Sequence, residues 1–95
     1  MKLNTLVSYL NRELQIEQFR DYCPNGLQVE GNSEVQRIVT GVTACQDLID
    51  AAVAYKADAI LVHHGYFWKG EPEAIVGIKK QRIQTLLQHD MSLLA

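Results

Sequence analysis

The apolar positions in the first fifteen residues recur at intervals of three and four. They are Leu3, Leu6, Val7, Leu10 and Leu14. This spacing places one apolar stripe along a helix and polar groups opposite, so it predicts a helix from about residue 4 to residue 18. Cys23-Pro24-Asn25-Gly26 then has turn chemistry, and Leu27-Gln28-Val29 alternates like a short strand.

Two further apolar segments predict a β-α-β unit between Ile38 and His63. The β-branched stretch 37–42 is typical of a buried strand, and the continuous run 59–62 is too short for a helix and predicts a central parallel strand. Thr43 and Gln46 have the spacing of a capping box, which predicts a helix over about 44–56. Its expected inner face consists of Leu48, Ile49, Ala52 and Val53.

The last third of the chain predicts one more helix and one more strand. The helix is marked by Ile78, Ile83, Leu86 and Leu87 and ends near His89, and a strand begins at Met91. The pattern therefore predicts an α/β fold of β-α-β units, with a mainly parallel sheet flanked by helices. We expect residues 1–95 to make at most one small domain, and the apolar strand at the very end resembles a cut chain.

Composition restricts the possible partners. Apolar residues make up 47% of the 95 residues and charged residues 21%, which is typical of a small packed domain. The formal charge of −2 offers no basic surface for duplex nucleic acid or an anionic membrane, so small molecules and proteins are the expected partners. The N-terminal residues lack the continuous apolar stretch of a secretory signal or a membrane span. Cys23 and Cys45 show no pairing motif. We expect a cytoplasmic protein with free thiols.

His63 and His64 end the predicted central strand, just before Gly65. Ligands of open α/β sheets bind at the carboxyl ends of strands, and Thr43 reaches the same edge at a helix N-terminus. Two imidazoles suit zinc, manganese, iron or nickel. Both can reach one site only if the backbone twists at His64-Gly65, because a regular strand sends consecutive side chains to opposite faces. The alternative is that one ring packs in the core and the other faces solvent.

Other residues have weaker claims to chemistry. Cys45, in the first turn of a predicted helix, is a candidate nucleophile with a histidine as base, or a packing residue. The aromatic run 66–68 either stacks a nucleobase or covers a core edge or a subunit contact. His89 is expected to cap its helix. Surface roles are expected for Asp21, Asp47, Asp50 and Asp58.

Three segments together resemble the N-terminal part of the NIF-three-like family, whose members are often labelled GTP cyclohydrolase 1 type 2 homologues. They are residues 21–31 (DYCPNGLQVEG), 39–44 (VTGVTA) and 58–70 (DAILVHHGYFWKG). The resemblance implies a fold of two similar halves, in proteins of roughly two and a half times this length. It also implies a ring-shaped homohexamer with two divalent metal ions in the cleft of each subunit.

In this resemblance His63 and His64 match the family's first two metal ligands. The remaining ligands are an aspartate just beyond the strand that begins at Met91, and a histidine and a glutamate from the C-terminal half, none of which is in these 95 residues. The resemblance implies a metal-dependent hydrolase that acts on GTP or a related nucleotide. The alternative is a non-catalytic metal-binding scaffold or protein-interaction module. We expect this segment alone to be inactive and to bind one ion weakly at most.

Overall fold

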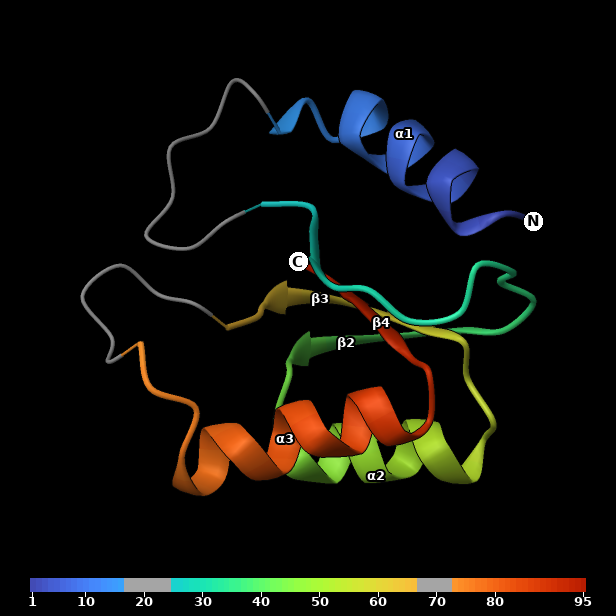
Figure 1. The fold of residues 1–95 in the computed structure, drawn as a ribbon. Coiled ribbons are helices and arrows are strands. Elements are labelled where there is room, and N and C mark those ends of the chain that lie inside the picture. The colour runs from blue at the N-terminus through green and yellow to red at the C-terminus, as the bar shows by residue number, and fades with distance from the viewer. Residues whose placement is uncertain (17–24, 67–72) are drawn as a thin grey trace.

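A computed structural model describes residues 1–16, 25–66 and 73–95. In these residues, three helices and four strands follow one another in the order α1-β1-β2-α2-β3-α3-β4 (Figure 1). The helices are α1 (Leu3–Glu13), α2 (Gln46–Ala54) and α3 (Gly77–Gln88), and the strands are β1 (Leu27–Val29), β2 (Ile38–Thr43), β3 (Ala59–His64) and β4 (Ser92–Leu94).

The strands form one mainly parallel sheet in the order β1-β4-β3-β2. β2, β3 and β4 are parallel, and β1 runs antiparallel to β4. β3 therefore lies in the interior of the sheet, as its continuous apolar run predicted. The predicted β-α-β unit is confirmed: α2 connects β2 to β3, and α3 connects β3 to β4 in the same way.

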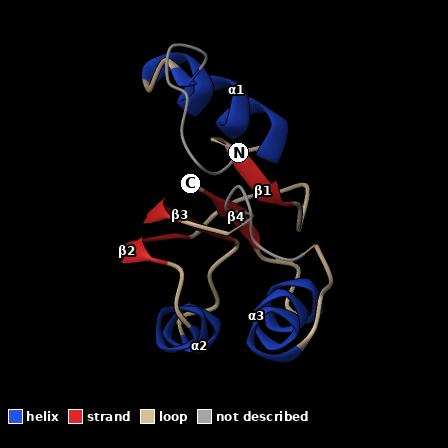
Figure 2. Cartoon of the chain, turned by 90° about the vertical axis from the view of Figure 1, so that its left-hand side faces the viewer, coloured by secondary structure: helices blue, strands red, loops and turns tan. Residues whose placement is uncertain are grey.

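The helices cover the two faces of the sheet unequally. α2 and α3 lie side by side against one face, and α1 lies on the other (Figure 2). The core is accordingly divided into two clusters of buried residues. The α1 side contains Leu3, Leu6, Val35, Ala59 and Leu94. The larger cluster on the side of α2 and α3 includes Ile49, Ala52, Ile60, Leu86 and Leu93.

The first helix is shorter than predicted. α1 ends at Glu13, and Leu14 and the positive φ of Gln15 (50°) follow it. Leu3 and Leu6 are buried as the stripe predicted, but Leu14 is exposed because it lies beyond the helix. Residues 17 and 18 of the predicted helix lie outside the described residues.

The prediction that β2 is a buried strand is wrong. β2 is the last strand of the sheet order, and Ile38 and Val42 are 44% and 68% exposed. β-branched side chains favour extended backbone wherever a strand lies, so their presence does not indicate that both faces and both edges are covered.

The predicted capping box is also absent. β2 continues through Thr43, and Cys45 is the N-cap of α2, with no side-chain cap hydrogen bond among the described residues. The Gln46 side chain instead donates to Asp50 Oδ1 (2.8 Å) and Thr85 Oγ1 (3.4 Å). α2 thus spans 46–54 rather than 44–56, although Ile49 and Ala52 form its buried face as expected.

α3 buries fewer apolar residues than its sequence suggested. Ile83 and Leu86 are buried, whereas Ile78 and Leu87 are exposed. The helix therefore presents a narrow apolar stripe to α2 and the sheet. In the part of the chain that the structure describes, no helix is long and apolar enough to cross a membrane.

Candidate metal centre

The carboxyl end of β3 lies beside the carboxyl end of β2. His64 is in register with Thr43, and the Ala44 N–H donates to the His64 carbonyl oxygen at 2.9 Å. The expectation that Thr43 and the histidine pair share one edge of the sheet is confirmed. His63 is exposed and His64 is half-buried, so neither residue is enclosed in the core.

The two imidazoles lie against each other. Their ring centroids are 4.3 Å apart and the ring planes meet at 73°. Side chains that left a regular strand toward opposite faces would be much farther apart. The rings therefore share one place, rather than one lying in the core while the other faces the opposite side.

This pair has the donor chemistry of a metal site but too few donors to complete one. Each neutral imidazole offers one nitrogen lone pair, and a closed tetrahedral zinc site takes four protein ligands. In the described ranges, no three His, Cys, Asp or Glu side chains are placed to hold one ion together. The two histidines thus fit as part of a metal site, with positions left for other ligands.

Tyr66 anchors the turn that follows the histidines. Its hydroxyl donates to the carbonyl oxygen of Ala44, and the Arg82 guanidinium carbon lies 5.8 Å from its ring centroid. Burial raises the pKa of Tyr66 to about 12, and the nearby Arg82 charge opposes this shift. Tyr66 therefore covers a core edge, the second of the two roles considered for the aromatic run; Phe67 and Trp68 lie outside the described residues.

Gln28 is a residue of this region that the sequence did not single out. Its Nε2 donates to the Tyr66 carbonyl oxygen at 2.9 Å, and its Oε1 accepts from the Tyr66 N–H at 2.8 Å. The two residues are 38 positions apart, so no local pattern indicates this contact.

The remaining candidates have structural roles or stay open. Cys45 is a free, half-buried thiol at the N-cap of α2, not in its first turn as predicted. His89 follows α3, and its Nδ1 lies 2.9 Å from the Thr85 carbonyl oxygen, which confirms the expected capping position. Cys23 and Asp21 lie outside the described residues.

The four aspartates were expected to have surface roles, and Asp58 does more than that. Its Oδ2 accepts from the backbone N–H groups of Gln36 (2.8 Å) and Arg37 (3.1 Å), so it fixes the approach to β2. Asp47 and Asp50 are exposed on α2.

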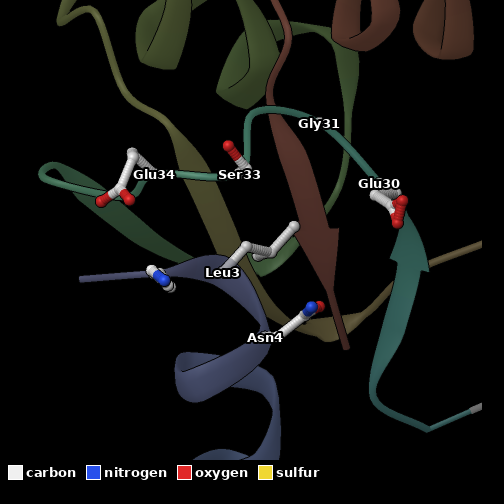
Figure 3. A pocket seen from close by; sticks show the side chains of 7 residues that line it. Leu3, Asn4, Glu30, Gly31, Ser33 and Glu34 are labelled. Atoms are coloured by element: carbon white, nitrogen blue, oxygen red, sulfur yellow. The ribbon is translucent and has the colours of Figure 1, made fainter.

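A cavity of about 350 Å³ lies at the opposite edge of the sheet (Figure 3). It is lined by the start of α1 and by the loop after β1, including Asn4, Glu30, Ser33 and Glu34. Because β1 runs antiparallel to β4, this loop lies at the amino ends of β2, β3 and β4. The cavity is therefore separate from the histidine pair.

Known proteins match this chain closely. The chain is 62% identical over 88 residues to the GTP cyclohydrolase 1 type 2 homolog of Yersinia pestis, covering 93% of the chain and 36% of that protein. It is 63% identical over 90 residues to the protein of the same name from Vibrio cholerae, covering 95% and 36%. The chain thus spans a little over a third of the length of these relatives.

Solved structures agree with the sequence matches. The structure described as protein ybgI of unknown function is 54% identical, superposes with a TM-score of 0.97, and is matched over all of this chain and 38% of its own. The family model described as DUF34/NIF3 (NGG1p interacting factor 3) matches residues 1–95. The expected family resemblance is confirmed, and the chain belongs to the DUF34/NIF3 family.

Proposed function

We propose that His63 and His64 are ligands of divalent metal ions, in a protein that carries this segment as part of a dinuclear, hydrolase-like site. The observation that supports this most directly is the 4.3 Å separation of the two ring centroids at the carboxyl end of β3. Zinc, manganese, iron and nickel suit imidazole nitrogen. The substrate class we propose is a nucleotide or a related compound, in line with the name of the relatives.

The residues of this chain supply two nitrogen donors and the frame that holds them. The Ala44 N–H fixes the His64 carbonyl oxygen, and Tyr66 fixes the following turn. His63 and His64 act as ligands and not as proton carriers, because a coordinated nitrogen has no free lone pair. When bound, two divalent ions would supply Lewis-acid activation of water and of a substrate oxygen. The further ligands would come from outside these 95 residues.

The proposal also covers the location of the protein, its assembly and the metal affinity of this segment. We infer a cytoplasmic protein that self-associates as a homohexamer, as the family resemblance implies. The segment alone offers two donors, so several coordination positions of an ion would be left to water, and we expect one weakly bound ion at most.

Cobalt titration of the 95-residue chain, followed by visible absorption, tests the metal proposal. We expect weak uptake of one ion, and a loss of affinity of about tenfold or more in His63→Ala and in His64→Ala. His89→Ala is the matched control, because His89 caps α3 through Thr85. Equal affinity in the wild type and both pair variants would overturn the proposal, and so would tight binding of two ions by the segment alone.

Turnover needs a full-length family member that carries the histidine pair. A nucleotide hydrolysis screen with and without added metal, repeated with the first histidine of the pair changed to alanine, separates the two functional classes. Metal-dependent hydrolysis that the substitution abolishes supports the enzyme. Metal uptake without metal-dependent turnover of any nucleotide would favour a non-catalytic scaffold.

A further inference from the structure

Gln28 occupies an irregular position in β1. Leu27 pairs with Leu94, and Val29 pairs with the neighbouring Leu93, so the register shifts between the two pairs. Two steps along β1 correspond to one step along β4, which makes Gln28 the extra residue of a bulge. Bulges turn a side chain out of the regular alternation and are frequent beside active sites.

The side chain of Gln28 reaches the backbone just beyond the histidine pair. Its amide makes two reciprocal hydrogen bonds with Tyr66, one to the carbonyl oxygen (2.9 Å) and one from the N–H (2.8 Å). In an antiparallel sheet, the backbone of a residue on the neighbouring strand makes the same two hydrogen bonds, one to the carbonyl oxygen and one from the N–H of its partner. The Gln28 amide takes the place of such a backbone. The register of β4 with β3 ends at Leu94 and Leu61, so Gln28 acts on backbone beyond that register.

Gly65 shows how closely Gln28 packs on this turn. A Cβ atom on Gly65 would overlap Gln28 Oε1 and would lie 2.8 Å from Gln28 Cδ and 2.7 Å from Ala95 Cβ. Glycine at this position therefore allows the amide to lie directly on the turn. Any side chain here would push Gln28 away from Tyr66.

The other side of the same turn is held by Ala44. Its N–H donates to the His64 carbonyl oxygen at 2.9 Å, and its own carbonyl oxygen accepts from the Tyr66 hydroxyl. The backbone from His64 to Tyr66 is thus fixed by β1 on one side and by the loop between β2 and α2 on the other. Loss of either contact would leave this backbone segment held from one side only.

We propose that Gln28 is a positioning residue for the histidine pair: through the Tyr66 backbone, it holds the His63 and His64 rings in the arrangement that accepts a metal ion. The part of this inference that concerns metal rests on the proposed function. Gln28 itself need not touch the ion. Residues that orient metal ligands in this way typically change metal affinity by about 10–100-fold when they are replaced.

The test compares Gln28→Met with wild type, because methionine keeps the length of the side chain and removes both hydrogen bonds. Without metal, NMR should show faster amide hydrogen exchange at Tyr66 and a weaker cross-relaxation contact between the two imidazole rings. With cobalt, the affinity should fall by about tenfold or more and the visible spectrum should change. Gln84→Met, on the exposed side of α3, is the matched control and should change none of these.

Gln28→Glu provides a second variant in case Gln28→Met does not fold. It keeps an acceptor for the Tyr66 N–H but sets a carboxylate oxygen against the Tyr66 carbonyl oxygen, so Tyr66 amide exchange and the ring contact should change in the same direction as in Gln28→Met. Unchanged Tyr66 exchange and ring contact in a folded Gln28 variant would overturn the proposal. Unchanged cobalt affinity and spectrum, despite a loosened turn, would also overturn it while the metal proposal stands.

The same experiment separates failure of the two proposals. If the wild-type chain takes up no cobalt, the metal proposal fails for this segment. The exchange and ring-contact measurements, which need no metal, then decide by themselves whether Gln28 positions the imidazoles.

Discussion

The hydroxyl of Tyr66 donates a hydrogen bond to the carbonyl oxygen of Ala44, a residue 22 positions earlier in the chain. Ala44 is fully buried, and its N–H donates to the His64 carbonyl oxygen. Ala44 thus makes hydrogen bonds to both His64 and Tyr66, the two residues on either side of Gly65. Two hydrogen bonds thereby join the loop after β2 to the segment after β3.

Tyr66→Phe should lower the free energy of unfolding by about 1–3 kcal/mol, because it leaves the buried Ala44 carbonyl oxygen without its donor. Urea denaturation followed by circular dichroism measures this. Tyr9→Phe is the control, since Tyr9 is exposed on α1. Its effect should stay within about 0.5 kcal/mol. Similar effects of the two substitutions would show that the Tyr66 hydroxyl does not stabilise the fold.

Tyr66 should also make the stability of the chain depend on alkaline pH. Burial raises the pKa of Tyr66 from 10.0 to about 12, so the folded chain keeps this proton to a higher pH than the unfolded chain does. The stabilisation is complete below pH 10. It is lost as pH rises from 10 toward about 12, where the unfolded chain binds fewer protons than the folded chain.

Urea midpoints measured across this pH range in EDTA, for wild type and Tyr66→Phe, isolate this contribution. Other groups titrate in both proteins, so their contributions cancel in the comparison. The stability advantage of the wild type over Tyr66→Phe should therefore shrink as pH rises, because the unfolded chain loses the Tyr66 proton first. An advantage that stayed constant or grew would mean that the folded state does not hold the Tyr66 proton more strongly.

Gly31→Ala should destabilise the loop at the other edge of the sheet. A Cβ atom on Gly31 would overlap the Asp90 carbonyl oxygen and lie 2.5 Å from the Met91 carbonyl carbon. Both are backbone atoms that side-chain rotation cannot move aside, so we expect a loss of about 1–3 kcal/mol in the free energy of unfolding. Thermal denaturation compares this variant with Ser33→Ala, an exposed neighbour that should remain close to wild type. Equal melting temperatures would contradict the close backbone contact.

The sequence predicted a strand correctly where the apolar run of the strand matches its burial in the sheet. The apolar run of β3 is buried at Ala59, Ile60 and Val62, because an interior strand of this sheet has helices over both faces. β2 has a similar run but lies at the edge, and that position depends on β4 pairing between β1 and β3. Sheet order is a long-range property, which a local run of β-branched residues does not carry.

The sequence predicted the position of the candidate site, but it did not predict the contacts that hold the backbone after the histidine pair. The carboxyl-edge rule placed His63 and His64 beside Thr43, and the structure has them there. The contacts that hold the turn come from Gln28 and Ala44, which lie 38 and 22 positions from Tyr66. The local sequence around Gln28 and around Ala44 has no feature that indicates a contact with Tyr66, so only the folded chain shows these contacts.

The two adjacent leucines of α3 give the sharpest check of the helix phase. Both leucines mark this helix in the sequence, but Leu86 is fully buried and Leu87 is 53% exposed. Leu86→Asp should cost about 3–5 kcal/mol, since it removes a core side chain and buries an unpaired carboxylate. That loss approaches the whole stability of a small domain, so the variant should be largely unfolded at room temperature.

Leu87→Asp introduces the same carboxylate one residue later, on the exposed side of the helix. It should remain folded, with a change of about 0.5 kcal/mol, as should Gln84→Ala. Circular dichroism during thermal unfolding separates these outcomes. Equal losses of stability in Leu86→Asp and Leu87→Asp would contradict the burial of Leu86 and the exposure of Leu87 on α3.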